Sequence, residues 1–586
     1  MVSFLKNIVS SCLGTVLGLG LLILIIIGIG SAIGSLQQDV LVKDRSVLRV
    51  HLPDFIPERT NNLPMGLEYL TQENVWGIHD LAHAIREAAQ DSDIEAIILE
   101  TGNSQSFVHM DILRQALHVF KRSGKPVYAY GDYYGQIDLY LTSIADSLYL
   151  NPLGQAELKG FAIIEPFVKD ALENVGIEME VYYAGDFKSA TEPFRRNSMS
   201  EENEIQLREF LNELYSNLLD SISVSRGIPS QELRNIASTY SSRRASDALR
   251  LGLVDVVGYD GDLIKDLKER LGYEESIKMN VIELSRYRTH TGRSRNYFAD
   301  NKMAVIYMEG EIRDDGEDEG RISAKRYVPM LRKIGRDDEI KAVVLRINSP
   351  GGDAMTSDKI LAEIKRLRSK GKTVVASLGD VAASGGYYIA TQSDSIFASQ
   401  QTITGSIGVF SIFPNINRMF EDKLNIYMDS VSTSRFAGIG SYVLERSEAE
   451  KKIFQESTDS MYNVFLNIVA TGRNMAMDQV KRIAQGRIWT GETALELGLI
   501  DEIGDLPRAM DCAAGIANIE DYRVIEYPES KSPLQQLSEE LSDMGDMDRQ
   551  IGKAIDQKIP GFGSYYRLLD NSRHIQAWMP YRFILN

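Results

Sequence analysis

Short apolar runs alternate with amphipathic stretches along most of the chain. The runs AVVLRI (342–347) and TVVASLG (373–379) are rich in β-branched residues and end at turn residues, which is typical of buried strands. Between them, DKILAEIKRLRSK (358–370) has apolar residues at helical spacing. Strands that alternate with helices favour parallel sheets joined by right-handed crossovers, so we predict an α/β fold.

The same pattern occurs twice. DSDIEAIILE and KPVYAYGD in the first half correspond to RDDEIKAVVLRI and KTVVASLGD in the second, and ASDALRLGLVDVVG recurs as TGETALELGLIDEIG, at a nearly constant offset of about 247 residues. We interpret this as a tandem duplication. The predicted organisation is an N-terminal segment (1–45), a first repeat (46–285), a polar linker (286–301), a second repeat (302–525) and a C-terminal tail (526–586).

The N-terminal segment contains a long apolar stretch. No charged side chain occurs between Lys6 and Asp39, and residues 12–34 exceed the roughly 20 apolar residues that a helix needs to cross a bilayer. A cleaved signal peptide is the alternative, but its apolar stretch is typically only about 7–15 residues long. We therefore expect a single membrane anchor, with Lys6 on the cytoplasmic side and the body of the protein outside.

Composition excludes several classes of function. The formal net charge is −18, whereas nucleic-acid binding needs a clustered surplus of Lys and Arg, so no nucleic-acid partner is expected. The two cysteines, Cys12 and Cys512, are too few and too distant for a disulfide framework. No group of residues has the spacing of a metal site, and we expect neither a metal nor an organic cofactor.

Ser384 follows a predicted strand in GDVAASGGYYIATQSD (379–394) and precedes a helical stretch. A nucleophilic serine needs an exposed hydroxyl on a tight strand-to-helix turn, with backbone N–H groups nearby for the oxyanion. Gly385 and Gly386 permit such a turn, and the helix N-terminus adds a positive dipole end. Taken alone, however, the motif is more typical of a serine that caps a helix.

Two further turns contain candidate residues. NSPGGD (348–353) places Gly351 and Gly352 at the carboxyl end of a predicted parallel strand, where α/β sheets gather their ligands and backbone N–H groups could complete an oxyanion hole. In TITGSIG (402–408), Ser406 stands where a hydroxyl could orient a base. Each segment by itself is more typical of an ordinary turn.

The base is the next question. The seven histidines are at positions 51, 79, 83, 109, 118, 290 and 574, so the second repeat has none of its own for a Ser-His-Asp triad, and those of the first repeat have no triad context. Lysine is the remaining candidate, provided that burial lowers its pKa from about 10.4 toward neutrality. Lys188, in VYYAGDFKSATEPF (181–194), lies among aromatic and small residues that could desolvate it.

The duplication links Ser384 to Lys188. Subtracting the offset from Ser384 gives Gln136, so the first repeat lacks the hydroxyl. Adding it to Lys188 gives Phe436 and Ala437, so the second repeat lacks the amine. Because one copy retains only the nucleophile and the other only the base, we predict one composite site built across the two repeats.

With these residues the chain resembles the long form of the signal peptide peptidase A family, also called protease IV, whose members are bacterial membrane-anchored serine proteases. The resemblance rests on GDFKSATEPF, SPGG, GDVAASGGYYIA and TGSIGV, and covers nearly the whole chain except the tail after about residue 525. It implies two repeats of a ClpP/crotonase-like fold. It also implies Ser384 as nucleophile, Lys188 as general base and acid, Ser406 as the hydroxyl that orients the lysine, and main-chain oxyanion donors at Gly352 and Gly385.

The resemblance further implies partners and a location. Its members degrade signal peptides left in the membrane, as ring-like homotetramers in the bacterial cytoplasmic membrane with the catalytic body on the periplasmic side. Three alternatives stay open: an acyl-CoA enzyme of the same superfamily, against which the lack of Glu or Asp in the ASGG turn argues; a catalytically silent membrane scaffold; and a protease for misfolded envelope proteins. The sequence also leaves open whether Ser384 and Lys188 meet within one chain or between chains, and which residues form the specificity pocket.

Overall fold

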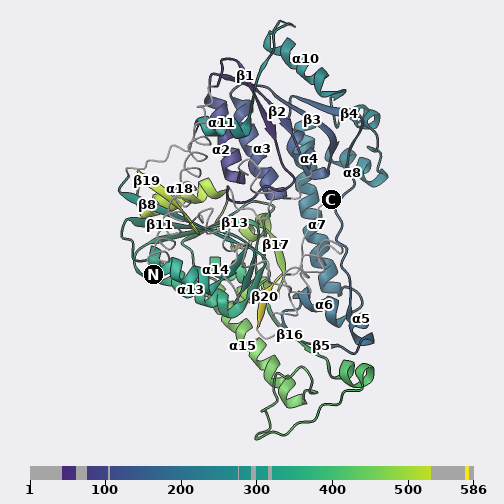
Figure 1. Ribbon diagram of the computed structural model, residues 1–586, viewed down its shortest axis with the longest axis vertical. Helices are drawn as coiled ribbons and strands as arrows, with labels where there is room; N and C mark the ends of the chain where they lie inside the picture. The colour runs from purple at the N-terminus through teal and green to yellow at the C-terminus, as the bar shows by residue number, and fades with distance from the viewer. Residues whose placement is uncertain are drawn as a thin grey trace, which may run out of the picture.

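Residues 42–60, 76–102, 106–274, 276–291, 299–314, 320–529 and 575–579 are described by the computed structural model of this chain. The two predicted repeats form two adjacent α/β bodies, one above the other in Figure 1. The predicted anchor, residues 12–34, lies outside the described residues, as does most of the predicted tail. Within the described ranges, no helix combines the length and the apolar character needed to cross a bilayer.

The first repeat is built on a parallel six-stranded sheet with the strand order β6-β4-β3-β2-β1-β7. Its strands are β1 (Ser46–His51), β2 (Ile94–Glu100), β3 (Val127–Tyr134), β4 (Ser147–Ala156), β6 (Val256–Val257) and β7 (Asn280–Glu283). One face packs against α2 (Ile78–Gln90) and α3 (Phe107–Arg122), and the other against α10 (Asp260–Leu271). Because both faces are covered, the central strands β1 and β2 are buried along most of their length.

The second repeat has the same strand order. Its sheet runs β18-β14-β13-β11-β8-β19, formed by β8 (Asn301–Glu309), β11 (Ile340–Ser349), β13 (Thr373–Ala383), β14 (Ser395–Ala398), β18 (Glu502–Ile503) and β19 (Tyr522–Tyr527). A side branch from β13 consists of β15 (Ile403–Gly405) and β17 (Ile488–Thr490). Helices α12 (Ala324–Ile334) and α13 (Ala354–Ser369) cover one face, and α18 (Leu506–Ala517) covers the other. The shared order confirms the predicted duplication.

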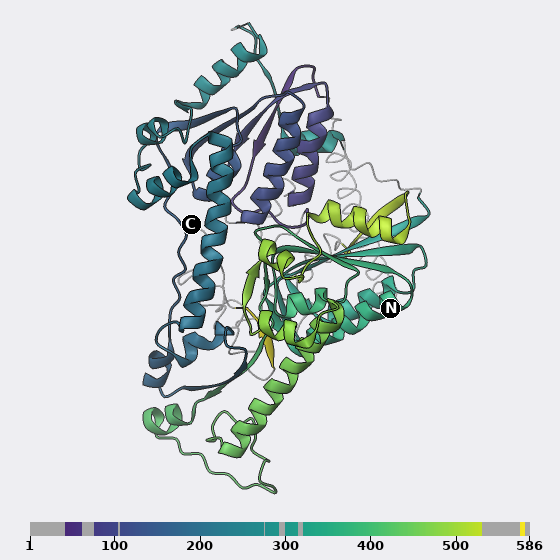
Figure 2. The ribbon, with the colours of Figure 1, turned by 180° about the vertical axis from the view of Figure 1, so that it is seen from behind.

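A third sheet joins the two repeats. Its order is β10-β9-β12-β20-β16-β5, with β9 (Glu311–Arg313), β10 (Arg321–Ser323), β12 (Gly351–Asp353), β16 (Val409–Asn415), β20 (Gln576–Trp578) and β5 (Glu178–Ala184). Strand β5 belongs to the first repeat, yet it pairs antiparallel with β16 of the second over its whole length. Helix α7 (Glu201–Arg226) runs alongside both bodies, and α15 (Glu448–Gly472) packs on β5 and β16 (Figure 2). Because of this pairing, the segment that follows β5 lies against the second repeat.

The segment expected to be a linker, residues 286–301, begins inside a helix. Helix α11 (Leu284–Thr291) follows directly after β7. Tyr287 in this helix is buried, and its hydroxyl donates a hydrogen bond to Asp91 at 3.0 Å. The surrounding SRYRTHTGR is otherwise polar, so the helix has too few apolar residues to show a period in the sequence.

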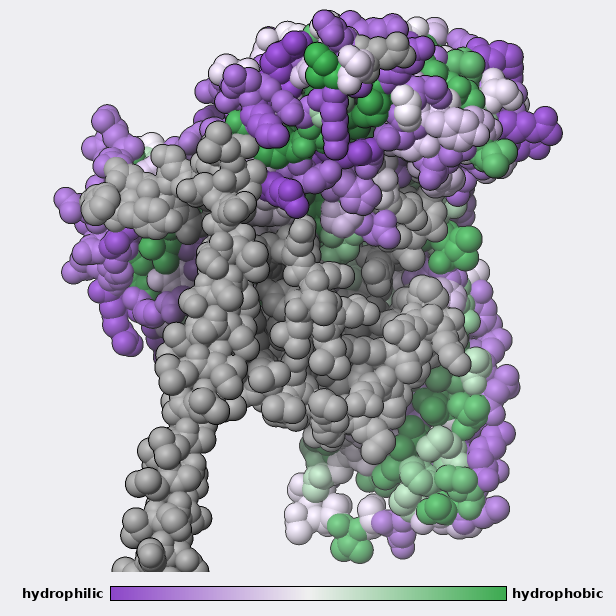
Figure 3. All heavy atoms as spheres, turned by 45° about the horizontal axis from the view of Figure 1, so that its top comes forward, coloured by the Kyte–Doolittle hydropathy of each residue, from purple (hydrophilic) through white to green (hydrophobic). Residues whose placement is uncertain are grey.

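Exposed apolar side chains gather on the segment between β16 and α15, at the lower end of the molecule in Figure 1. They include Leu424, Tyr427, Val431 and Phe436. Figure 3 shows apolar side chains grouped at the lower right of its view. This end of the second repeat therefore offers an apolar surface of the kind that marks interaction sites.

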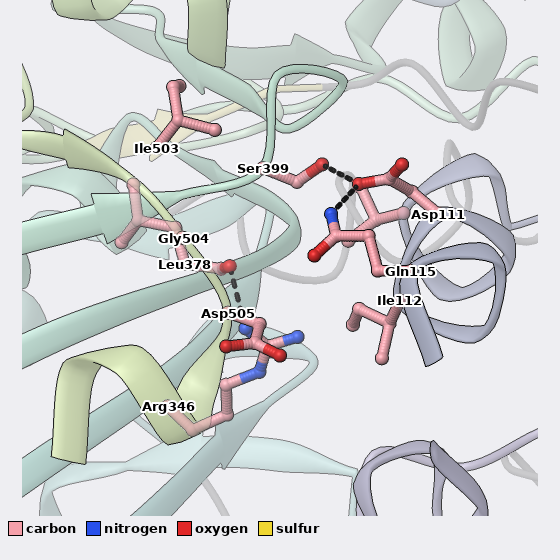
Figure 4. Close-up of a pocket in the computed structure, with 10 residues that line it drawn as sticks. Asp111, Ile112, Gln115, Arg346, Leu378, Ser399, Ile503, Gly504 and Asp505 are labelled. Atoms are coloured by element: carbon pink, nitrogen blue, oxygen red, sulfur yellow. Dashed lines mark hydrogen bonds between the residues drawn. The ribbon is translucent and has the colours of Figure 1, made fainter. Parts of the chain in front are cut away.

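A buried ion cluster connects the two repeats. Arg346 on β11 donates to both carboxylate oxygens of Glu58, which belongs to the first repeat, at 2.9 and 3.0 Å. Burial alone would raise the pKa of Glu58, but Arg346 and His109 outweigh it and hold that pKa well below its ordinary value. A pocket beside the cluster is lined by Arg346, by Asp111 of α3 and by Asp505 of the second repeat (Figure 4).

Replacing Glu58 should destabilise the contact between the repeats. Glu58→Gln leaves the buried Arg346 guanidinium without its counter-charge, and we expect the free energy of unfolding in urea to fall by about 3–5 kcal/mol. The matched control is Glu204→Gln, which removes an exposed pair with Arg208 and should leave stability nearly unchanged. Equal losses in the two variants would contradict this account.

Candidate active site

Ser384 occupies the turn between β13 and α14 (Gly385–Ala390), as the sequence predicted. Its φ of 54° and ψ of −116° lie in a region that residues with a side chain rarely adopt. The turn is fixed on both sides, because Ser384 N–H donates to Gly405 O and Tyr388 N–H donates to Ser384 O, both at 2.8 Å. Ser384 is thus the N-cap residue of α14, but its hydroxyl makes no capping hydrogen bond to that helix.

Lys188 reaches Ser384 from the other repeat. It follows β5 and precedes a short 3-10 helix, Ser189–Thr191. Its Nζ donates to Ser384 Oγ at 2.9 Å, to Ser406 Oγ at 3.0 Å and to Ser406 O at 3.3 Å. The two residues that the duplication argument linked therefore meet within one chain.

The Lys188 side chain is almost completely removed from solvent, with 1% of its surface exposed. Burial lowers the pKa of its ammonium group from 10.5 to about 7. Its three hydrogen-bond acceptors are a backbone carbonyl and two hydroxyls, all uncharged. The amine is therefore neutral in a large fraction of molecules at neutral pH.

Ser406 is the third residue of the site, beside Ser384 and Lys188. It follows β15 with a φ of 50°, and its N–H donates to Arg487 O at 2.7 Å. That backbone bond fixes the residue while its side-chain and main-chain oxygens both accept from Lys188. The position is suited to holding the amine toward Ser384.

Close backbone packing holds the Lys188 loop against the second repeat. A Cβ on Gly185 would lie 2.5 Å from the carbonyl carbon of Gln485, and a Cβ on Gly486 would lie 2.6 Å from Cβ of Lys188. Both glycines have positive φ, so a side chain at either position would be strained as well as crowded. Phe187 N–H adds a hydrogen bond to Gln485 O at 2.8 Å.

Gln206 contacts the Lys188 loop, an arrangement that sequence reasoning missed. From α7 its amide donates to Phe187 O and Ser189 Oγ, each at 3.1 Å, on both sides of Lys188. Its carbonyl oxygen accepts from Ile488 N–H of the second repeat at 3.3 Å. A signal did exist, because Gln206 shares the buried face of α7 with Leu207 and other apolar residues, where a polar side chain needs partners.

Gly351 and Gly352 lie beside Gly385, so the two predicted groups of backbone donors converge. Their φ values are 97° and 149°, conformations that favour glycine. A Cβ on Gly351 would lie 2.7 Å from the amide nitrogen of Gly385. The turn after β11 and the start of α14 thus meet next to Ser384, where their N–H groups could hold an oxyanion.

The equivalent position of the first repeat has a carboxamide in place of the hydroxyl. Gln136 begins α4 (Gln136–Thr142) and is 1% exposed. Its side-chain oxygen accepts from Lys159 N–H at 3.0 Å and from Gly160 N–H at 2.7 Å. This carboxamide links two loops where the second repeat has a hydroxyl.

Three of the first-repeat histidines lie close to carboxylates. His79 and His109 lie 3.7 and 3.3 Å from Glu58, and His51 lies 3.3 Å from Glu100. In the described part of the chain, no cluster of three or more His, Cys, Asp or Glu is arranged to hold a metal ion.

The geometry of Lys188 and Ser384 suits proton transfer between an amine and a hydroxyl, because a neutral amine at 2.9 Å can accept the hydroxyl proton.

Comparison with known proteins gives a consistent match. The profile of Peptidase family S49 matches residues 119–274 and 366–520, one stretch in each repeat. The chain is 32% identical over 533 residues to "Protease 4" of Haemophilus influenzae, covering 88% of this chain and 85% of that protein. It is 34% identical over 502 residues to "Protease 4" of Salmonella typhi, covering 83% and 79%. It is also 32% identical over 489 residues to the chloroplastic serine protease SPPA of Arabidopsis thaliana, covering 80% and 71%.

Lys188→Met should stabilise the protein. The lysine pKa is about 7 in the folded chain against 10.5 as its ordinary value, so the unfolded chain binds the proton more tightly and the parent gains stability as pH rises between these values. In the variant no ammonium group has to lose its proton on folding, so this loss of stability is absent. Its gain in the free energy of unfolding, roughly 4 kcal/mol at pH 7, should shrink toward zero near pH 10.5.

Urea denaturation at pH 7 and pH 10 measures this difference. Lys452→Met is the matched control, because the Lys452 side chain is 76% exposed, and its effect should be small at both pH values. A stability gain in Lys188→Met that does not depend on pH would contradict the desolvation account.

Proposed function

Because this chain belongs to peptidase family S49 and is a serine peptidase, we propose that Ser384 is its nucleophile and Lys188 its general base. The observation that carries the proposal is the contact of 2.9 Å between Lys188 Nζ and Ser384 Oγ. With its pKa lowered to about 7, the lysine supplies a free amine at working pH.

The reaction begins when Ser384 Oγ attacks the carbonyl carbon of a peptide while its proton passes to Lys188 Nζ. The resulting oxyanion accepts hydrogen bonds from the N–H groups of Gly352 and Gly385. Lys188 then donates its proton to the leaving amine as the C–N bond breaks. A water molecule hydrolyses the serine ester by the same route, which restores the hydroxyl and releases the acid.

Ser406 serves as the residue that orients the lysine. Its two oxygens accept hydrogen bonds from the two N–H groups of the neutral amine, which leaves the Nζ lone pair to accept the hydroxyl proton of Ser384. Because the side-chain and main-chain oxygens of one residue hold the amine, rotation of the lysine side chain away from Ser384 is opposed.

Substrate and location are part of the same proposal. The segments GDFKSATEPF and GDVAASGGYYIA, on which the resemblance to the signal peptide peptidase A family rests, support a role in the cell envelope, with signal peptides that remain in the cytoplasmic membrane as substrates. Residues 12–34 provide the anchor, and the catalytic body lies on the periplasmic side. The exposed apolar segment between β16 and α15 supports self-association, which we assign to a homotetramer.

Removing either member of the pair should abolish peptide hydrolysis. We expect Ser384→Ala and Lys188→Met each to lower kcat/KM for an apolar fluorogenic peptide by about 10⁴-fold or more, since the nucleophile and its base act as a unit. Lys452→Met should retain parental activity, and circular dichroism should show that all variants are folded. Activity that survives in Lys188→Met would mean that another group is the base.

The pH dependence of the reaction should report the lysine. Below its pKa of about 7 the protonated amine cannot accept the serine proton, so kcat/KM should fall about tenfold per pH unit as the solution is made more acidic. Above pH 7, kcat/KM should become independent of pH. A profile that is flat between pH 5 and pH 8, measured with the same peptide, would count against Lys188 as the base.

A further inference from the structure

The carboxamide of Gln206, on α7, lies between the Lys188 loop and the second repeat. Its Nε2 donates to Phe187 O at 3.1 Å, and this carbonyl belongs to the peptide bond that joins Phe187 to Lys188. On the other side of the lysine, Nε2 donates to Ser189 Oγ at 3.1 Å. The carboxamide oxygen accepts from Ile488 N–H, in strand β17, at 3.3 Å. One side chain of the first repeat therefore binds both the loop that carries the lysine and a strand of the second repeat.

Strand β17 also fixes the backbone beside both serines of the site. It pairs antiparallel with β15, with Ile488 opposite Gly405. The carbonyl oxygen of Gly405 accepts from Ser384 N–H at 2.8 Å, and Ser406 N–H donates to Arg487 O at 2.7 Å. The carboxamide is thus bonded to β17 at the residue that lies opposite the neighbour of Ser406. Its hydrogen bonds connect the backbone on both sides of the lysine to the backbone that positions the two serines.

The side chain of Arg487 forms a second connection between the same segments. Its guanidinium carbon lies 4.9 Å from the centre of the Phe187 ring and 4.4 Å from that of the Trp489 ring. It also forms an ion pair with Glu209, three residues after Gln206 on α7. The Glu209 side chain is 61% exposed, however, and exposed ion pairs contribute little. The buried carboxamide is therefore the contact whose loss should change the site most.

The orientation of the Gln206 carboxamide is fixed by a buried network. Gln206 is 2% exposed, and its Nε2 makes a further hydrogen bond to Asn203 Oδ1 at 3.0 Å. Asn203 in turn donates from Nδ2 to the buried carboxylate of Glu192 at 3.2 Å. The nitrogen end of the carboxamide thus faces hydrogen-bond acceptors, and its oxygen end faces an N–H donor. Buried networks in which each group has a partner are rigid, so this contact holds the two segments at one separation.

We propose that Gln206 is a positioning residue, which holds the Lys188 loop against β17 so that the amine stays directed at Ser384 and shielded from water. This role rests on the proposed function of Ser384 and Lys188. The contacts of Gln206 are with the main chain and the hydroxyl beside the lysine, so it acts through the loop and not on the reacting atoms. Without the carboxamide the loop is less firmly held, water reaches the amine, and the protonated form is favoured.

The pH profile of peptide hydrolysis tests this role. Gln206→Met has a side chain of similar length but no N–H donor and only a weak acceptor. We expect kcat at pH 7 to fall at least about tenfold, with KM changed less than about twofold, because the base is displaced while the substrate contacts remain. The midpoint of the acid limb should move up by about one pH unit, because a hydrated amine has a higher pKa. An acid limb that stays at the parental pH would overturn the positioning role.

Asn217→Leu is the matched control. Asn217 lies further along α7 and donates from its amide to Glu492 of the second repeat at 3.2 Å. The variant therefore also removes an amide hydrogen bond between α7 and the second repeat, but one that does not involve the Lys188 loop. It should keep the parental kcat and acid limb. An acid limb shifted equally in Asn217→Leu and Gln206→Met would show a general effect of loosening α7 and would contradict the proposal.

Urea denaturation at pH 7 gives a readout that does not depend on catalysis. Lys188→Met should raise the unfolding midpoint of the parent because it removes a buried amine. In the Gln206→Met background the amine is hydrated, so the same replacement should raise the midpoint by no more than about half as much. An equal gain in both backgrounds would contradict the proposal. Peptide hydrolysis that persists in Ser384→Ala would instead mean failure of the proposed function, and the urea comparison would still show whether Gln206 shields the amine.

Ser189→Ala provides a milder variant in case Gln206→Met does not fold. It removes one of the two acceptors that the Lys188 loop offers to Gln206 and leaves the bond to Phe187 O. Its acid limb should move in the same direction by a smaller amount, measured with the same peptide. No shift in Ser189→Ala, together with failure of Gln206→Met to fold, would assign Gln206 a role in folding alone and overturn the proposal.

Discussion

Removal of water from the Lys188 side chain is the condition on which the chemistry of this site depends. In water a lysine amine is protonated at neutral pH and cannot accept a serine proton. Burial lowers its pKa to about 7, so the shift comes from packing alone. That packing exists because β5 leaves the first repeat and pairs with β16, which carries Lys188 against Gly486 and Ser406 of the second.

The duplication explains why neither repeat contains a site of its own. Both repeats keep the same strand order, but Gln136 of the first uses its carboxamide to join two loops at the position of the nucleophile. In the second repeat the counterpart of the Lys188 segment, around Ala437, is irregular and exposed. The first repeat therefore supplies the base, Lys188, and the second repeat contains the turn that holds Ser384.

Much of this arrangement could be predicted from the sequence, because it is local. The runs at 342–347 and 373–379 form buried strands, and the Ser384 turn follows from its flanking strand and glycines. The rest depends on contacts between distant segments. No periodic pattern in the sequence indicates the pairing of β5 with β16, the Glu58–Arg346 pair or the three-residue strand β20. Each of them is determined by the distant segment that it contacts and not by its own residue pattern.

The claim that one chain supplies both halves of the site can be tested by mixing inactive variants. Differently tagged Ser384→Ala and Lys188→Met chains are co-expressed, and species that contain both tags are purified and assayed with the fluorogenic peptide. If Lys188 and Ser384 pair within a chain, each chain lacks one member and the mixture stays inactive. Recovery of a substantial fraction of parental activity would show that the lysine of one chain serves the serine of another, and would contradict the account.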